Sequence, residues 1–197
     1  MVISTLGSTP SAIVWLLWVL FGVYWAVSAL NSKKTKRRET WPQRLAYVLP
    51  LLAAMALLSR PEAHRGWLGA RLFPFSSAIE WLGVALVAAG IAIAFWARWH
   101  LGANWSGTVT LKENHELIRT GPYRSIRHPI YTGILLALLG TAVQIGQVRS
   151  FLAFVVAWLC FFFKARREES FLREEFGDRF AEHTGRTGMF LPRLSAR

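Results

Sequence analysis

Residues 11–30 read SAIVWLLWVLFGVYWAVSAL and carry no charged side chain. An α-helix rises 1.5 Å per residue, so about twenty residues cross a hydrocarbon core about 30 Å thick. A basic run follows at 33–38, whereas residues 1–10 carry no charge. A cleaved signal peptide has the opposite arrangement, with its positive charge before the apolar segment. This stretch therefore predicts a retained membrane helix whose N-terminus lies outside the cytosol.

Further apolar segments extend this prediction along the chain. Residues 78–97 form a second stretch of membrane-spanning length, and 45–58 form a shorter one that contains Pro50, which membrane helices tolerate. Residues 130–163 are apolar except for a polar centre at 144–150, which indicates two short antiparallel spans around a tight turn. Each arm is shorter than about twenty residues, so the turn lies among the headgroups or the hairpin packs partly inside the protein. We predict an all-α polytopic membrane protein with about five transmembrane helices, the last two forming a hairpin.

Composition and charge agree with this class. The chain is 53% hydrophobic and has 23 Lys and Arg against 11 Asp and Glu. The hydrophobic content excludes a disordered chain, and the single cysteine, Cys160, excludes an intramolecular disulfide and a multi-cysteine metal site. We expect one membrane-embedded domain over 1–197, with three helices in 1–97 and the catalytic half in 98–197.

The distribution of basic residues predicts the orientation. With five spans and an outside N-terminus, the segments 31–44, 98–129 and 164–197 lie in the cytosol and hold nineteen of the 23 basic residues. Basic residues accumulate in cytoplasmic loops, so the net charge of +12 follows from topology and from attraction to anionic headgroups. Membrane lipids are therefore expected partners, and nucleic acid is not.

The first polar cytosolic segment, 98–129, ends in candidate binding residues. Pro129 suits the first position of the fourth span and favours an extended His128. Arg127 and His128 then stand at a helix N-terminus, where unpaired N–H groups and the helix dipole suit a carboxylate or phosphate.

The second polar segment, 164–197, contains paired acids on a predicted helix. Apolar residues recur at every fourth position: Leu172, Phe176 and Phe180. This spacing predicts a cytosolic amphipathic helix that follows or continues the fifth span. Glu168 falls on the apolar stripe, and Glu169 lies beside it, four residues before Arg173, at the spacing of a helical ion pair.

The ordered pattern across both segments resembles the isoprenylcysteine carboxyl methyltransferase and phospholipid methyltransferase superfamily. The matching residues are His115-x-Leu117, Gly121-Pro122-Tyr123, Arg127-His128-Pro129-x-Tyr131-x-Gly133, Glu168-Glu169 and Phe176-Gly177. The resemblance implies an integral membrane enzyme that uses S-adenosylmethionine, with the cofactor held by cytosolic connections around the last spans. It places these residues around the cofactor: His115, Leu117, Gly121, Tyr123, His128, Pro129, Tyr131, Glu168 and Glu169.

The chemistry of methyl transfer suggests catalytic roles for Arg127, Glu168 and Glu169. A carboxylate acceptor needs no general base, and Arg127 would hold it in line with the methyl group. An amine or thiol acceptor must lose a proton, and either glutamate would be the base. Where members of the superfamily often have Tyr, this chain has Phe180 and His183, so the acceptor stays open beyond being lipophilic or lipid-linked.

Two other functions are compatible with the residues. Membrane sterol reductases, which use NADPH, also carry an Arg-His-Pro-x-Tyr segment, but they are longer and lack the preceding Gly-Pro-Tyr. A non-catalytic lipid-binding membrane protein is the second alternative. No metal is expected, because the histidines lack close ligand spacing.

Overall fold

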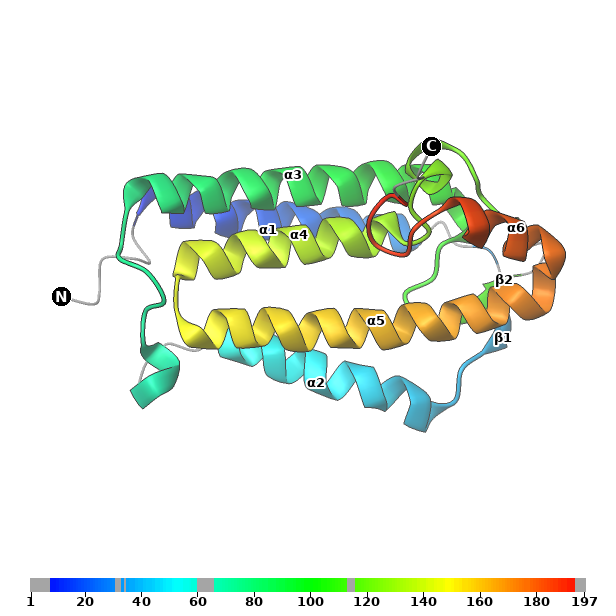
Figure 1. Ribbon diagram of the computed structural model, residues 1–197, viewed down its shortest axis with the longest axis horizontal. Helices are drawn as coiled ribbons and strands as arrows, with labels where there is room; N and C mark the ends of the chain where they lie inside the picture. The colour runs from blue at the N-terminus through cyan, green and yellow to red at the C-terminus, as the bar shows by residue number, and fades with distance from the viewer. Residues whose placement is uncertain (1–7, 31–32, 34, 60–65, 113–115, 194–197) are drawn as a thin grey trace.

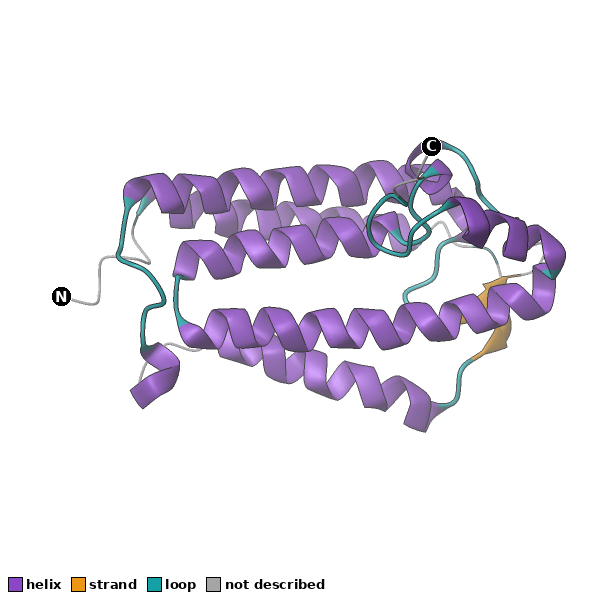
Figure 2. Ribbon diagram, viewed as in Figure 1, coloured by secondary structure: helices purple, strands orange, loops and turns teal. Residues whose placement is uncertain are grey.

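The structure is a computed structural model that describes residues 8–30, 33, 35–59, 66–112 and 116–193. Long helices lie along one axis, with α1, α3 and α5 running in one direction and α2 and α4 in the other, and a short helix lies at one end (Figure 1). The helix bounds are α1 Thr9–Ala29, α2 Trp41–Ser59, α3 Ser77–Leu101, α4 Pro129–Ile145, α5 Val148–Phe176 and α6 Asp178–Arg186. The 3-10 turns are η2 Gly66–Gly69, η3 Gly102–Asn104 and η4 Gly121–Arg124. The predicted all-helical polytopic architecture is confirmed (Figure 2).

Four of the helices, α1, α2, α3 and α5, are long and apolar enough to cross a membrane. Apolar side chains on α1 and α2 face outward, including Trp15 at 69% exposure and Leu52 at 59%. Such surface is costly in water and suits hydrocarbon. The fifth apolar helix, α4, has only 17 residues, as expected for the first arm of the hairpin.

The structure decides between the two alternatives for the amphipathic helix. This helix continues the fifth span, because α5 runs without interruption through 29 residues, so the second arm is longer than the apolar segment alone suggested. The helix ends only at Gly177, whose φ of +50° is costly for other residues. The continuous helix carries Glu168 and Glu169 rigidly from the membrane portion into the polar end.

The inner helix α4 owes its position to glycines that it shares with α3. Gly90 and Gly133 face each other so closely that a Cβ on Gly90 would lie 2.4 Å from the Gly133 carbonyl oxygen. Gly83 and Gly140 repeat this arrangement two turns away, where a Cβ on Gly83 would lie 2.8 Å from the Gly140 carbonyl oxygen. Small residues let helix backbones approach in membranes, where packing replaces the hydrophobic driving force. Most of α4 is therefore buried within the protein.

Two buried arginines connect α5 with α2 and α3 with α1 through hydrogen bonds to backbone carbonyls. Arg149, at the start of α5, donates from Nη1 to the carbonyls of Leu57 and Leu58 near the end of α2. Arg98, near the end of α3, donates from Nη2 to the Ser28 carbonyl in α1, 2.5 Å away. Each arginine donates to carbonyls in the last turn of a neighbouring helix, where intrahelical N–H donors run out.

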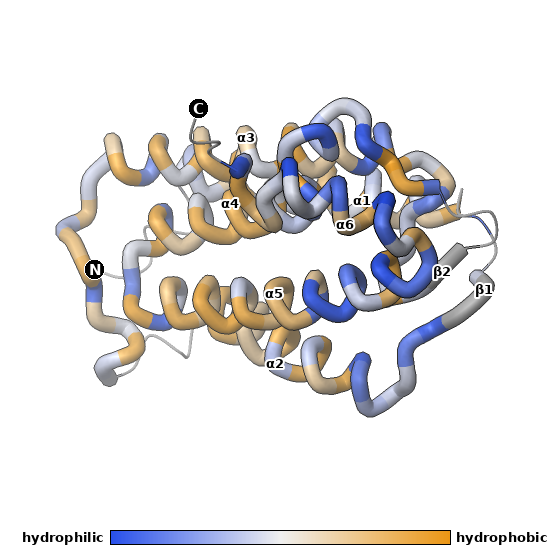
Figure 3. The backbone as a smooth tube through the Cα atoms, turned by 45° about the vertical axis from the view of Figure 1, so that its right-hand side comes forward, coloured by the Kyte–Doolittle hydropathy of each residue, from blue (hydrophilic) through white to orange (hydrophobic). Residues whose placement is uncertain are grey.

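The polar segments gather at the end of the bundle opposite the described start of α1 (Figure 3). There a short antiparallel ribbon pairs β1, Thr35–Arg38, with β2, Thr110–Lys112. The sequence interpretation had assigned 33–38 to topology alone. The ribbon instead ties the connection between α1 and α2 to the segment that precedes the Arg-His-Pro motif.

Candidate functional site

A pocket of about 320 Å³ opens at the polar end and extends between the helices. Its deep part is apolar and receives one residue from each of four helices: Trp25, Leu51, Ile134 and Phe161. Its outer part is polar and includes these residues: Asn104, Ser106, Thr108, Thr110, Arg127, His128, Tyr131, Lys164 and Glu168. The pocket therefore joins charged groups to an apolar space among the spans.

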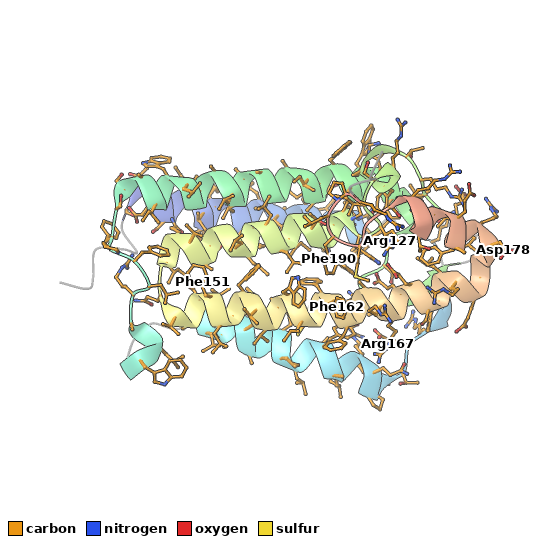
Figure 4. The ribbon with its side chains drawn as sticks, in the orientation of Figure 1. Arg127, Phe151, Phe162, Arg167, Asp178 and Phe190 are labelled. Atoms are coloured by element: carbon orange, nitrogen blue, oxygen red, sulfur yellow. The ribbon has the colours of Figure 1, made fainter. Side chains whose placement is uncertain are left out.

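Local backbone structure places Arg127 and His128 at this pocket. The chain after α6 folds back, so the Arg127 amide donates to the Gly188 carbonyl at 2.9 Å and the His128 amide donates to Met189 at 3.0 Å. Pro129 begins α4 at the predicted first helical position. Figure 4 shows Arg127 close to Phe190, where this returning segment meets the start of α4.

Two carboxylates and two basic side chains form a compact charged cluster. Arg127 Nε donates to Glu169 Oε1 at 2.6 Å, and His128 Nε2 lies 3.2 Å from the same oxygen. On its other side, His128 Nδ1 lies 3.5 Å from Glu168 Oε2. The hydroxyl of Tyr131 donates to Glu168 Oε1 at 2.5 Å. The imidazole thus bridges the paired glutamates.

The protonation of His128 follows from this bridge. Burial alone would lower its pKa, because a charged imidazolium loses its hydration. Hydrogen bonds and the charges of Glu168 and Glu169 outweigh burial and raise the pKa of His128 above its usual range. With both ring nitrogens protonated, His128 donates toward both carboxylates.

The paired glutamates have different surroundings. Glu168 lines the pocket. Glu169 does not line it and instead forms ion pairs with Arg127 and His128. Glu169 thus turns toward these two residues, away from the helical ion pair with Arg173 that its spacing suggested. Adjacent residues on a helix point about 100° apart, which explains how neighbours in sequence separate in this way.

Lys164 is a pocket residue that sequence reasoning missed. Its Nζ donates to the Gly107 carbonyl at 2.9 Å and lies 5.4 Å from the ring centroids of Tyr47 and Tyr131. The sequence interpretation counted Lys164 only among the basic residues of the cytosolic side. Its spacing of four from Glu168 on one helix face was the signal that could have found it.

The structure brings together part of the predicted set. Tyr123, Arg127, His128, Tyr131 and Glu168 line the same pocket. The other predicted residues that the structure describes lie outside its lining: Leu117, Gly121, Pro129 and Glu169. His115 lies outside the described residues. Within the described ranges, no group of three His, Cys, Asp or Glu side chains is arranged to hold a metal ion.

This arrangement suits a ligand that carries both charge and apolar surface. Glu168 offers a carboxylate to a cationic group, while Arg127 and Lys164 offer hydrogen-bond donors to an anion. Trp105 and Tyr123 provide aromatic surface beside them.

Comparison with known proteins identifies the family. The family model described as phospholipid methyltransferase matches residues 78–179, which include α3, α4, α5 and the charged cluster. The chain belongs to the phospholipid methyltransferase family. This membership agrees with the resemblance inferred from the ordered motif.

Individual proteins are also similar to this chain. A probable protein-S-isoprenylcysteine O-methyltransferase of Oryza sativa subsp. indica is 32% identical over 117 residues, covering 58% of this chain and 61% of the relative. The cobalt-zinc-cadmium resistance protein CzcN of Cupriavidus metallidurans is 31% identical over 147 residues, covering 74% of this chain and 62% of the relative. The chain thus spans about three fifths of the length of these curated relatives.

A solved structure supports the fold. The eukaryotic intramembrane Ras methyltransferase, an isoprenylcysteine carboxyl methyltransferase, superposes with a TM-score of 0.56 at 23% identity. The match covers 78% of this chain and 53% of the solved chain. This phospholipid methyltransferase family member therefore shares the polytopic helical fold of that enzyme.

Proposed function

We propose that this protein is an S-adenosylmethionine-dependent methyltransferase whose acceptor is lipophilic or lipid-linked. One observation carries the proposal: a single pocket joins the buried cluster of Glu168, His128 and Tyr131 to an apolar space among four helices. A charged cofactor and an apolar acceptor would meet where the charged cluster adjoins the apolar space.

The residues of the pocket fit the cofactor. S-adenosylmethionine carries a sulfonium and an ammonium, which match the carboxylate of Glu168, and a carboxylate, which matches Lys164 or Arg127. Trp105 and Tyr123 offer aromatic surface to adenine and to the sulfonium.

The proposed catalysis rests on positioning. When bound, the cofactor supplies an activated methyl carbon with a neutral thioether as leaving group, so no side chain has to protonate that group. The protein orients the two reactants in line and excludes water with Trp25, Leu51 and Phe161 at the apolar end. Catalysis of this kind depends on the rigid placement of Glu168 by Tyr131 and His128.

The role of Arg127 or Glu168 depends on the acceptor. The rice relative and the solved structure are named for O-methylation and carboxyl methylation of an isoprenylcysteine. These names favour a carboxylate acceptor, which needs no base and would be held by Arg127 or Lys164. An amine or thiol acceptor would give its proton to Glu168, because Glu168 lines the pocket and Glu169 does not.

The acceptor would enter from the bilayer, and the site would face the cytosol. The deep part of the pocket is lined by side chains of α1, α2, α4 and α5, and the outer faces of α1 and α2 are apolar. Most basic residues lie in the segments that converge at the polar end, which the positive-inside rule places in the cytosol.

Binding of S-adenosylhomocysteine to the detergent-purified protein tests the proposal. We expect a micromolar dissociation constant by calorimetry, weakened at least tenfold by Lys164→Gln. The exposed control Arg166→Gln, on the same helix, should bind normally. Binding of NADPH in place of the nucleoside would overturn the proposal in favour of a reductase. Binding of neither ligand to folded protein would also overturn it.

A further inference from the structure

A second pocket, of about 330 Å³, lies beside the first one. The two pockets share a wall, residues 105–108, and the second pocket opens where α1 ends and α2 begins. Its lining is predominantly polar and consists of Ala29, Thr35, Arg38, Glu39, Trp41, Arg44, Trp105, Ser106, Gly107 and Thr108. None of the proposed methyl-transfer groups, Arg127, Lys164 and Glu168, belongs to this lining.

Two arginines give the second pocket its charge. Neither Arg38 nor Arg44 pairs with a carboxylate among the described residues. The guanidinium carbon of Arg44 lies 5.2 Å from the ring centroid of Trp41, which holds the arginine without neutralising it. The pocket therefore presents positive charge that the described residues leave uncompensated.

The one acid in the lining does not cancel that charge. Glu39 has a side chain only 2% exposed, and its Oε1 accepts from the Tyr47 hydroxyl at 2.5 Å and from the Val109 amide at 3.2 Å. Its Oε2 lies 3.7 Å from Arg167 Nη1, which balances its charge from outside the pocket. Glu39 thus fixes β2 and α2 together, and the two arginines remain for a ligand.

The surroundings of the pocket indicate an amphiphilic ligand. Exposed apolar side chains of both helices lie within one or two turns of the opening: Val27, Leu30, Trp41 and Leu45. Arginine binds phosphate oxygens through paired N–H donors, and anionic phospholipids place such phosphates at this depth of the membrane. A small soluble anion would gain nothing from the apolar rim.

We infer that this second pocket binds the phosphate of an anionic membrane phospholipid, with Arg38 and Arg44 as its ligands and the acyl chains along α1 and α2. The lipid would brace residues 105–108 from the outside, opposite the Lys164 Nζ that holds the Gly107 carbonyl from the inside. The inference goes beyond the proposed methyl transfer and does not depend on it.

Titration of the full-length, detergent-purified protein with short-chain phospholipids tests this inference. The ligands are dioctanoyl phosphatidylglycerol, dioctanoyl phosphatidylcholine and inorganic phosphate, and the readout is tryptophan fluorescence, since Trp41 and Trp105 line the pocket. We expect phosphatidylglycerol to bind at least tenfold more tightly than phosphatidylcholine. Inorganic phosphate should fail to displace it at equal concentration.

Matched variants separate the pocket from the general basic surface. Arg38→Gln with Arg44→Gln should weaken phosphatidylglycerol binding about tenfold, and Arg38→Lys with Arg44→Lys should retain most of it. The control, Arg124→Gln with Arg166→Gln, removes two exposed arginines that lie outside the lining and should bind normally. Unchanged thermal unfolding of all variants establishes that they are folded.

Three outcomes would overturn the inference. An equal loss in the control pair would show nonspecific attraction to basic surface. Displacement by inorganic phosphate at equal concentration would assign the site to a free anion. Full affinity in the Arg38→Gln, Arg44→Gln variant would remove these residues from lipid binding.

Discussion

Glu168 and Glu169 are neighbours with different expected roles. We expect Glu168→Gln to lower methyl transfer by roughly 10²-fold or more and to cost less stability than Glu169→Gln, because this carboxylate faces the pocket. We expect Glu169→Gln to destabilise the protein by about 3 kcal/mol, because it removes the buried negative charge that pairs with Arg127 and His128. Thermal unfolding and initial rates on the same preparations measure both effects.

The control for this comparison is Glu175→Gln, an exposed glutamate near the end of the same helix. It should leave both the rate and the unfolding temperature unchanged. A Glu169→Gln protein that is as stable as the control and inactive would instead make Glu169 the glutamate that acts on the ligands.

The raised pKa of His128 predicts a pH dependence of stability. Protonated His128 bridges two carboxylates, so its stabilising contribution is fully present below its unfolded pKa of about 6.5. That contribution is lost as the pH rises through the higher folded-state pKa. We expect the unfolding temperature to fall above neutral pH, and His128→Gln to flatten this decline. A decline of the same size in His128→Gln would assign the titration to another group.

At the scale of elements, the glycine contacts between α3 and α4 set the position of the site. Gly133 belongs to the Arg-His-Pro motif region, yet its close neighbour is the backbone of Gly90, not the pocket. Gly90→Ala or Gly133→Ala would force the helices apart, at a cost of about 1–3 kcal/mol. We expect both variants to unfold at lower temperature and to bind S-adenosylhomocysteine more weakly, as Pro129 and Tyr131 shift with α4.

The matched control for the glycines is Gly22→Ala in α1, where no described atom outside the backbone of its own helix lies within 4 Å of the added Cβ. Alanine is also the better helix former, so this variant should be at least as stable as the parent protein. Loss of stability in Gly22→Ala equal to that in Gly90→Ala would contradict a role for close helix packing.

The elements show which features the sequence could predict. The predicted spans 11–30 and 78–97 begin within two residues of the starts of α1 and α3. This agreement is expected, because an uninterrupted apolar stretch must be helical in lipid. Hydropathy alone did not show where α5 ends, since the apolar run stops at 163 and the predicted apolar stripe runs past the break at Gly177 to Phe180. The β1–β2 pairing was equally hidden, because it depends on contacts between segments far apart in the chain.

The sequence also predicted part of the candidate site. The motif brought Arg127, His128, Tyr131 and Glu168 together, and each lines the pocket. The separation of Glu168 from Glu169 could not be predicted, because it depends on how α5 rotates against the start of α4. The returning segment that holds Arg127 through Thr187 and Gly188 gave no sequence signal of its own.

At the scale of the whole molecule, the helix bundle has two ends of different composition. The η2 turn and the α4–α5 connection lie at one end, held by hydrogen bonds from Leu72 to Gly146 and from Val148 to Ala70. The charged cluster, the ribbon and α6 lie at the other end (Figure 1). The segments 31–44, 98–129 and 164–197 hold nineteen of the 23 basic residues, so the positive-inside rule predicts that the second end faces the cytosol.

Cysteine labelling in intact cells measures this orientation. The single native cysteine is buried, so Cys160→Ala provides a background without reactive thiols. We expect Trp67→Cys, at the first end, to react with an impermeant maleimide from outside, because Trp67 is 70% exposed. Asp178→Cys, at the start of α6, should react only after the membrane is permeabilised. The reverse pattern would place the candidate site on the outer face and exclude a cytosolic cofactor supply.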